Sequence, residues 1–211
     1  CSKKGGVCSL RAYSDQGQRI ETVPGTLVAT CPKRFHQDGM VFQWVAKTLL
    51  DCATPAILTE LPFLMALKDD DGHSPVGRID MVLVDPGTRS SLNWCALEMQ
   101  AVYFSGRSVS VELRELRTYD GDGIAFPIGI RRPDFRSSGP KRLMPQLQIK
   151  VPTITRWGKK TAVVVDKCFW DSMAPMATVQ SVSNCDIAWF VVDFEEAGDR
   201  FDIRRHGLYL T

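Results

Sequence analysis

The sequence of 211 residues lacks any apolar run of the roughly 18 residues that a membrane-spanning helix requires. It also lacks an excess of charge of one sign, because 26 Lys and Arg residues stand against 24 Asp and Glu residues, for a formal net charge of +2. So small a net charge argues against binding of nucleic acid by bulk charge alone, and any basic surface must be local. No charged and then apolar leader follows Cys1, and we expect a soluble, cytoplasmic protein of a prokaryotic or phage-type cell interior, trimmed upstream and without membrane contact.

Histidine is scarce as well, with three residues in the chain. His36, His73 and His206 show no spacing typical of a cysteine and histidine nucleophile pair or of a histidine metal finger. The chain also lacks internal repeats, low-complexity tracts and a long Gly/Ser linker. With 44% hydrophobic residues, it is expected to form one globular domain, residues 36–211, preceded by a small N-terminal appendage, residues 1–35.

The seven cysteines fall into two groups. Four lie among apolar neighbours and are predicted core thiols: Cys52, Cys95, Cys168 and Cys185. Cys1, Cys8 and Cys31 lie instead in a polar, Gly-rich stretch, where thiols of an intracellular protein are more often metal ligands than packing residues. Their spacing fits no common zinc motif, so free thiols remain the alternative.

Hydrophobic patterning predicts alternating helices and strands. Helices are expected at residues 38–50, 107–119 and 145–150, and strands at residues 56–64, 77–84, 93–102, 161–166 and 185–194. Two shorter strands, residues 20–23 and 26–30, flank Pro24 and Gly25 and predict a hairpin in the appendage. A helical crossover before residue 161 favours a parallel partner for the strand that follows, so the fold class is α/β with a mixed sheet flanked by helices.

Two acidic residues stand inside apolar strands, Asp80 within residues 77–84 and Glu98 within residues 93–102. Because side chains alternate along a strand, Glu98 and Gln100 project from the same face. A Glu in an apolar strand is costly to bury unless a cation meets it. Carboxylates from adjacent strands can hold Mg²⁺, which activates water and stabilises charge on a phosphodiester.

These residues resemble the core of the PD-(D/E)XK nucleases, in which an Asp on one strand precedes Glu-x-Lys on the next. Here the second motif reads Glu98-Met99-Gln100, with Gln in place of Lys. More specifically, the chain resembles the NotI family of restriction endonucleases, in which the third position is Gln. Segments at residues 31–35, 77–80 and 134–138 carry this resemblance, which extends from Cys8 to about Asp193.

The resemblance implies that Asp80 and Glu98 bind Mg²⁺, that Gln100 lies near the attacking water, and that Glu60 is a further active-site carboxylate. The alternative is structural: Asp80 ends a strand, Glu98 pairs with Arg78, Gln100 faces solvent, and Glu60 is a surface acid of an edge strand. The resemblance also implies a PD-(D/E)XK-like nuclease domain at residues 36–211 and a homodimer.

In the resembled family, four N-terminal cysteines hold a structural iron. This chain offers Cys1, Cys8 and Cys31 for a structural iron or zinc. For the fourth ligand that the resemblance implies, we expect either a cysteine lost upstream or replacement by Cys52.

Residues 131–160 carry a net charge of +8, which leaves −6 for the remainder of the chain. Such a local excess is typical of contacts with DNA phosphates, although a solvated basic loop is the alternative. The predicted DNA-binding residues are Arg131, Arg132, Arg136, Lys141, Arg142, Lys159 and Lys160.

The sequence therefore predicts a type II restriction endonuclease that uses Mg²⁺ to hydrolyse double-stranded DNA at a specific target, GC-rich and palindromic. Two other functions stay open. One is a DNA-binding protein on a nuclease fold with an inactive site, which the missing Lys at position 100 would favour. The other is a nuclease of DNA repair that recognises damaged or flapped structures.

Overall fold

A computed structural model describes residues 8–12, 25–67, 73–87, 92–106, 110–121, 131–198 and 200–211. Cys1, the predicted strand at residues 20–23 and the first residues of the predicted helix 107–119 lie outside this range. None of the helices in the described part of the chain combines the length and the apolar character needed to cross a membrane.

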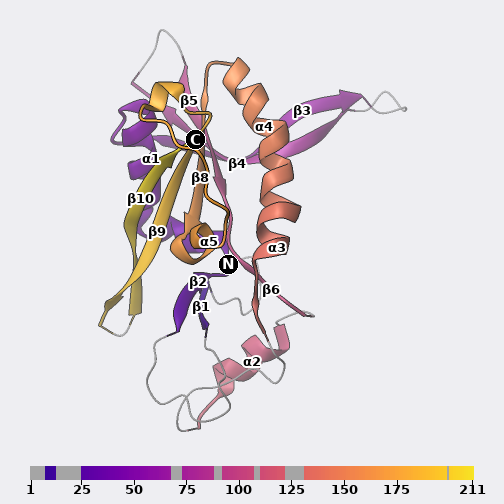
Figure 1. Cartoon of the computed structure of the whole chain (residues 1–211), viewed down its shortest axis with the longest axis vertical. Coiled ribbons are helices and arrows are strands. Elements are labelled where there is room, and N and C mark those ends of the chain that lie inside the picture. Colours follow the sequence, from indigo (N-terminus) through magenta and orange to yellow (C-terminus); the bar gives the residue numbers. More distant parts are fainter. Residues whose placement is uncertain are drawn as a thin grey trace.

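A six-stranded sheet in the order β10-β9-β8-β5-β4-β3 organises the molecule (Figure 1). Its strands are β3 (Ala56–Leu67), β4 (His73–Asp85), β5 (Asn93–Met99), β8 (Lys160–Asp166), β9 (Ile187–Ala197) and β10 (Arg200–Leu210). β5 pairs with β8 in parallel, as does β8 with β9, whereas the other neighbours are antiparallel. The predicted α/β class with a mixed sheet is confirmed, and so is the parallel partner of β8.

Two helices cover opposite faces of this sheet. α1 (Met40–Leu50) packs its apolar stripe, including Val41 and Val45, against Leu97 and Val164. α4 (Met144–Arg156) packs Leu147 and Val151 against Val163 and other residues of the opposite face. Because successive residues of β8 alternate between the two clusters, the strand is buried on both faces, which fits its continuous apolar sequence.

The N-terminal strands form a separate small sheet. β1 (Ser9–Ala12) pairs with β2 (Thr26–Ala29) in antiparallel orientation. The predicted hairpin partner of this strand, residues 20–23, lies outside the described residues, and the partner of β2 among the described residues is β1. β2 is also tied to the main body, because the backbone N–H of Ala29 donates to Asp166 Oδ2 at 2.7 Å.

Shorter elements connect these layers. They are η1 (Pro32–Gly39), β6 (Tyr103–Phe104), α2 (Ser110–Thr118), β7 (Pro133–Asp134), α3 (Phe135–Ser138), η2 (Gly139–Leu143), α5 (Lys167–Asp171) and η3 (Val182–Asn184). α3, η2 and α4 follow one another without a break, so most of the basic segment forms one helical rod alongside β8 (Figure 1). This rod is much longer than the helix predicted at residues 145–150.

Candidate functional site

The register of three neighbouring strands places three carboxylates in one row. Glu60 of β3 lies between the residues that pair with Met81 and Ile79, which puts it beside Asp80 of β4. The antiparallel ladder between β4 and β5 ends at the pair Met81 and Leu97, and Asp80 and Glu98 are the next residues along these two strands. Residues 60, 80 and 98 thus cross three strands side by side, although they are far apart in the sequence.

Glu60 has an unusual backbone for a strand residue, with a φ of 54°. This left-handed conformation costs a non-glycine residue about 1 kcal/mol and interrupts the ladder between β3 and β4. The Glu60 side chain is exposed, and its charge raises the pKa of Asp80, which places the two carboxylates within electrostatic reach of each other.

Asp80 is held by the backbone of the neighbouring strand. Its Oδ2 accepts a hydrogen bond from the N–H of Met99 at 3.0 Å. Burial raises the pKa of Asp80, and the charge of Glu60 adds to this, whereas the Met99 hydrogen bond and the charge of Lys150 act in the opposite direction. The carboxylate therefore lies in a partly dehydrated position where a cation would favour its ionised form.

Glu98 is almost fully buried, with 2% of its surface exposed. Both of its oxygens accept hydrogen bonds from the ammonium group of Lys150 at 2.8 Å. Burial raises the pKa of Glu98 to about 7, with a further contribution from Asp80, although Lys150 counteracts both. The cation that a buried Glu in an apolar strand requires is thus a lysine from α4.

Lys150 is a residue of this candidate site that the sequence did not assign to it. Its 3% exposure contradicts an interpretation of residue 150 as part of a solvated basic surface. The signal for its burial is helical spacing, because Lys150 shares one face of the helical rod with Leu143, Leu147 and Ile154, all of which are buried. Gln146, one turn before Lys150, accepts a third hydrogen bond from the ammonium at 3.0 Å.

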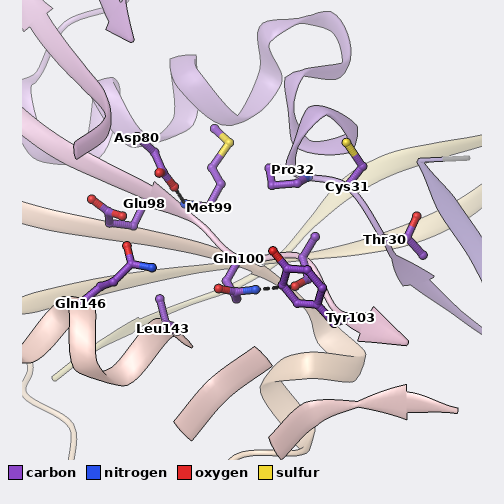
Figure 2. Close-up of a pocket in the computed structure, with 11 residues that line it drawn as sticks. Thr30, Cys31, Pro32, Asp80, Glu98, Met99, Gln100, Tyr103, Leu143 and Gln146 are labelled. Carbon is purple, nitrogen blue, oxygen red and sulfur yellow. Dashed lines mark hydrogen bonds between the residues drawn. The ribbon is translucent and has the colours of Figure 1, made fainter. Parts of the chain in front are cut away.

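Gln100 follows the last residue of β5 and is 9% exposed. Its backbone N–H donates to the carbonyl of Val164 at 3.0 Å, and its side-chain amide donates to the carbonyl of Ala101. In Figure 2 the amide lies between the Asp80 and Glu98 pair and the ring of Tyr103. The predicted alternation is present, since Leu97 and Met99 enter the α1 cluster whereas Glu98 faces α4.

These residues surround a pocket of about 230 Å³ (Figure 2). Its walls are Thr30, Cys31, Pro32, Asp80, Glu98, Met99, Gln100, Ala101, Tyr103, Leu143 and Gln146. The segment after β2 therefore forms one wall, β4 and β5 form the base, and the start of the α4 rod forms another wall. Thr30, Cys31 and Pro32, which belong to the predicted appendage, thus contribute directly to the pocket.

The cysteines give a partial picture. Cys8 and Cys31 lie next to each other. Burial raises the pKa of the Cys8 thiol, and the charge and hydrogen bond of the neighbouring Cys31 raise it further. Cys52 is buried in the α1 core, as predicted for a packing residue. Among the described residues, no three His, Cys, Asp or Glu side chains are grouped so as to hold a metal ion.

The predicted DNA-binding residues occupy three different environments. Arg132, Arg136, Lys141 and Arg142 are exposed, and the last three belong to α3 and η2. Arg142 also lies over the ring of Tyr103, with 3.9 Å between its guanidinium carbon and the ring centroid.

Arg131, by contrast, is partly buried and bonded inside the protein. Its guanidinium forms an ion pair with Glu112 of α2 and donates to the carbonyl of Ser105 at 3.0 Å. Lys159 donates to the carbonyl of Leu92 at 2.7 Å. Lys160 donates to the carbonyls of Ser183 and Cys185, at 2.9 and 2.7 Å.

Comparison with known proteins gives one family. The family model described as "Restriction endonuclease NotI" matches residues 1–204, almost the whole chain. No curated protein matches the chain. The family match spans the N-terminal cysteines, the three carboxylate strands and α4, and it confirms the resemblance seen in the sequence.

Proposed function

We propose that this chain, which belongs to the NotI family of restriction endonucleases, hydrolyses phosphodiester bonds at the pocket formed by Asp80, Glu98 and Gln100. Membership of the family makes the protein a type II site-specific deoxyribonuclease, a hydrolase that acts on double-stranded DNA. The observation that supports the location of the site is the row of Glu60, Asp80 and Glu98 across three strands.

The residues of the pocket fit a magnesium ion. Mg²⁺ prefers hard oxygen ligands, keeps several waters, and is usually held in proteins by one or two carboxylates plus substrate phosphate. Asp80 and Glu98 would supply those carboxylates, whereas Glu60, which does not line the pocket, would act on the ion through its charge near Asp80. Two carboxylates fall short of a complete protein cage, which agrees with the lack of any grouping of three ligands among the described residues.

When bound, Mg²⁺ would lower the pKa of a coordinated water and neutralise charge on the phosphate. Gln100 would orient that water, because its amide can both donate and accept hydrogen bonds. Arg132, Arg136, Lys141 and Arg142 would hold DNA phosphates, since their side chains are exposed and Arg142 lies over Tyr103, which lines the pocket. Arg131, Lys159 and Lys160 are less suited to this role because they already bond to groups of the protein.

The target and the assembly are further parts of the proposal. A GC-rich palindromic sequence is expected, together with a homodimer, because a two-fold protein places one active site at each strand of a palindrome. We expect the enzyme to act inside the cell, where a restriction system meets foreign DNA.

A structural iron or zinc on Cys1, Cys8 and Cys31 also belongs to the proposal. Its support is the proximity of Cys8 and Cys31, while Cys1 lies outside the described residues. Metal analysis of the purified chain tests it directly. Less than about one iron or zinc per ten chains would contradict it, because a structural site of this kind is filled when the protein folds.

The experiment that tests the nuclease proposal is digestion of large plasmid and genomic DNA with and without Mg²⁺. Discrete fragments with one terminal sequence are expected in Mg²⁺, and intact DNA in EDTA. Cutting only at flaps or lesions would favour a repair nuclease, and binding without cutting would favour an inactive DNA-binding protein. The presence of Lys150 weakens this last alternative, since the missing Lys at position 100 was its support.

A further inference from the structure

Lys150 carries an unusual combination of burial and bonding. Only 3% of its surface is exposed, and its ammonium can donate three hydrogen bonds. All three have protein acceptors: the two oxygens of Glu98 and the side-chain oxygen of Gln146. The ammonium is therefore held by the same carboxylate that the proposed function assigns to Mg²⁺.

A metal ion and this ammonium compete for one carboxylate. While Lys150 bonds to both oxygens of Glu98, a divalent cation at that carboxylate must share those oxygens with the ammonium. Two cations at such close range in a partly dehydrated pocket also repel each other strongly. The arrangement thus favours either Lys150 or the metal on Glu98, but not both in the geometry described.

Gln146 offers the ammonium a second position. It lies one turn before Lys150 on the same helix, and its oxygen is 3.0 Å from the ammonium nitrogen. It also lines the pocket together with Asp80 and Glu98 (Figure 2). A neutral acceptor at this place can retain the lysine without competing for the metal.

We propose that Lys150 is a positioning residue that acts as a resident cation of the carboxylate pair, holding Glu98 in place before metal binds and withdrawing toward Gln146 when Mg²⁺ takes over that carboxylate. This inference rests on the proposed function, because that function supplies the Mg²⁺. It gives a role to a lysine that lies on α4, outside the Glu98-Met99-Gln100 motif of β5.

Thermal unfolding in EDTA and in Mg²⁺, at pH 8, tests the exchange without any cleavage assay. Lys150→Met keeps an unbranched, flexible side chain that is one atom shorter, and it leaves Glu98 buried without a cation. Breaking a buried ion pair in this way should lower Tm in EDTA by about 10 °C. Addition of Mg²⁺ should restore at least about half of that loss, because the metal replaces the missing ammonium.

Three matched variants sharpen the test. Glu98→Gln combined with Lys150→Met removes both charges, so it should regain stability in EDTA and lose the response to Mg²⁺. Gln146→Met removes the second position of the ammonium, and the Mg²⁺ concentration needed for half-maximal stabilisation should rise severalfold. Lys47→Met, at an exposed i,i+4 pair of α1, should behave as wild type in both buffers.

An equal Mg²⁺ response in wild type and in Lys150→Met would overturn the inference, because a purely structural lysine cannot be replaced by a metal. If Lys150→Met does not fold in either buffer, Gln146→Met decides the test. An unchanged Mg²⁺ concentration for half-maximal stabilisation of that variant then overturns the inference. A failure of the proposed function has a different signature, since wild type would then leave DNA intact whatever the unfolding data show.

Discussion

The basic residues of the α4 rod and of the segment that follows it occupy three kinds of environment. At the pocket end, Lys150 lies inside the protein on Glu98, and Arg142 lies outside on the ring of Tyr103. At the far end, Lys159 and Lys160 donate to backbone carbonyls of neighbouring segments. One basic stretch of sequence thus serves as counter-charge, as candidate DNA contact and as structural anchor.

The direction of the strands explains this division. Lys160 pairs with Cys95 near the beginning of β5, whereas Glu98 and Met99 pair with Val163 and Val164 further along. The pocket lies at the C-terminal end of β5. Lys159 and Lys160, at the start of β8, therefore lie toward the opposite ends of these strands. Position along the strand, and not charge density, decides which basic residues can reach a substrate at the pocket.

The strongest test of the comparison is removal of a carboxylate at the pocket end. Asp80→Asn keeps the size of the side chain but removes the charge that would hold Mg²⁺, so single-turnover cleavage should fall by about a thousandfold or more. DNA binding in Ca²⁺ should change little. Asp171→Asn, at an exposed i,i+4 pair of α5, is the matched control and should cleave as wild type. Equal rates for the two variants would place the catalytic centre elsewhere.

Gln100→Ala should have a smaller effect on the same reaction. A neutral amide orients water by hydrogen bonding and supplies no charge, so its loss should slow the single-turnover rate by about a hundredfold to a thousandfold. The apparent affinity for Mg²⁺ should stay within about threefold of wild type, because Gln100 is not expected to be a ligand. A large shift in the Mg²⁺ requirement would instead make Gln100 part of the metal site.

Asp166 shows how a buried acid at the pocket end is stabilised without a lysine. Its two oxygens accept backbone hydrogen bonds from Ala29 and Phe169, each at 2.7 Å, and the first of these fixes the strand before the Thr30 and Cys31 wall. Asp166→Asn presents an NH₂ group to one of these donors, and should lower the free energy of unfolding by about 1 to 3 kcal/mol at pH 7. Urea unfolding measures this loss.

The pH dependence of the same measurement has a defined sign. Burial raises the pKa of Asp166 to about 6, so between pH 4 and pH 6 the native protein holds a proton that the unfolded chain has lost. The contribution of Asp166 to stability is therefore greatest below about pH 4 and is lost as the pH rises to about 6, by at most about 3 kcal/mol. Asp166→Asn should flatten this part of the profile, and an unchanged slope would contradict the assignment.

The smallest expected effect compares the two ends of the basic stretch directly. Lys141→Ala with Arg142→Ala should weaken DNA binding about tenfold and lower the slope of log K against log salt by about two. Lys159→Ala with Lys160→Ala removes the same charge at the far end and should leave that slope nearly unchanged, although some thermal stability is lost with the carbonyl contacts. Equal slopes for the two pairs would show that both ends contact DNA.

Local sequence patterns predicted most of the sheet. Apolar periodicity placed α1 and strands β3, β4, β5, β8 and β9 within a few residues, and the helical crossover predicted a parallel partner for β8, which proved to be β5 on one side and β9 on the other. β10 was not predicted, because Arg200, Arg204 and Arg205 interrupt its apolar pattern and it pairs in a hairpin with β9. Residues 151–156 of α4 were also missed, since Pro152 discourages the prediction of a helix interior.

By itself the sequence determined the family and the mixed α/β sheet, and it indicated Asp80, Glu98 and Gln100 as candidate site residues. These follow from short motifs and strand periodicity. Only the tertiary structure assigned Lys150 to Glu98, Glu112 to Arg131, and backbone carbonyls to Lys159 and Lys160. Lys150 and Glu98 are 52 residues apart in sequence. Periodicity reports which face of an element is buried, whereas the partner across that face depends on how helices and strands pack, and this packing decides whether a charge is buried, bonded or free to bind DNA.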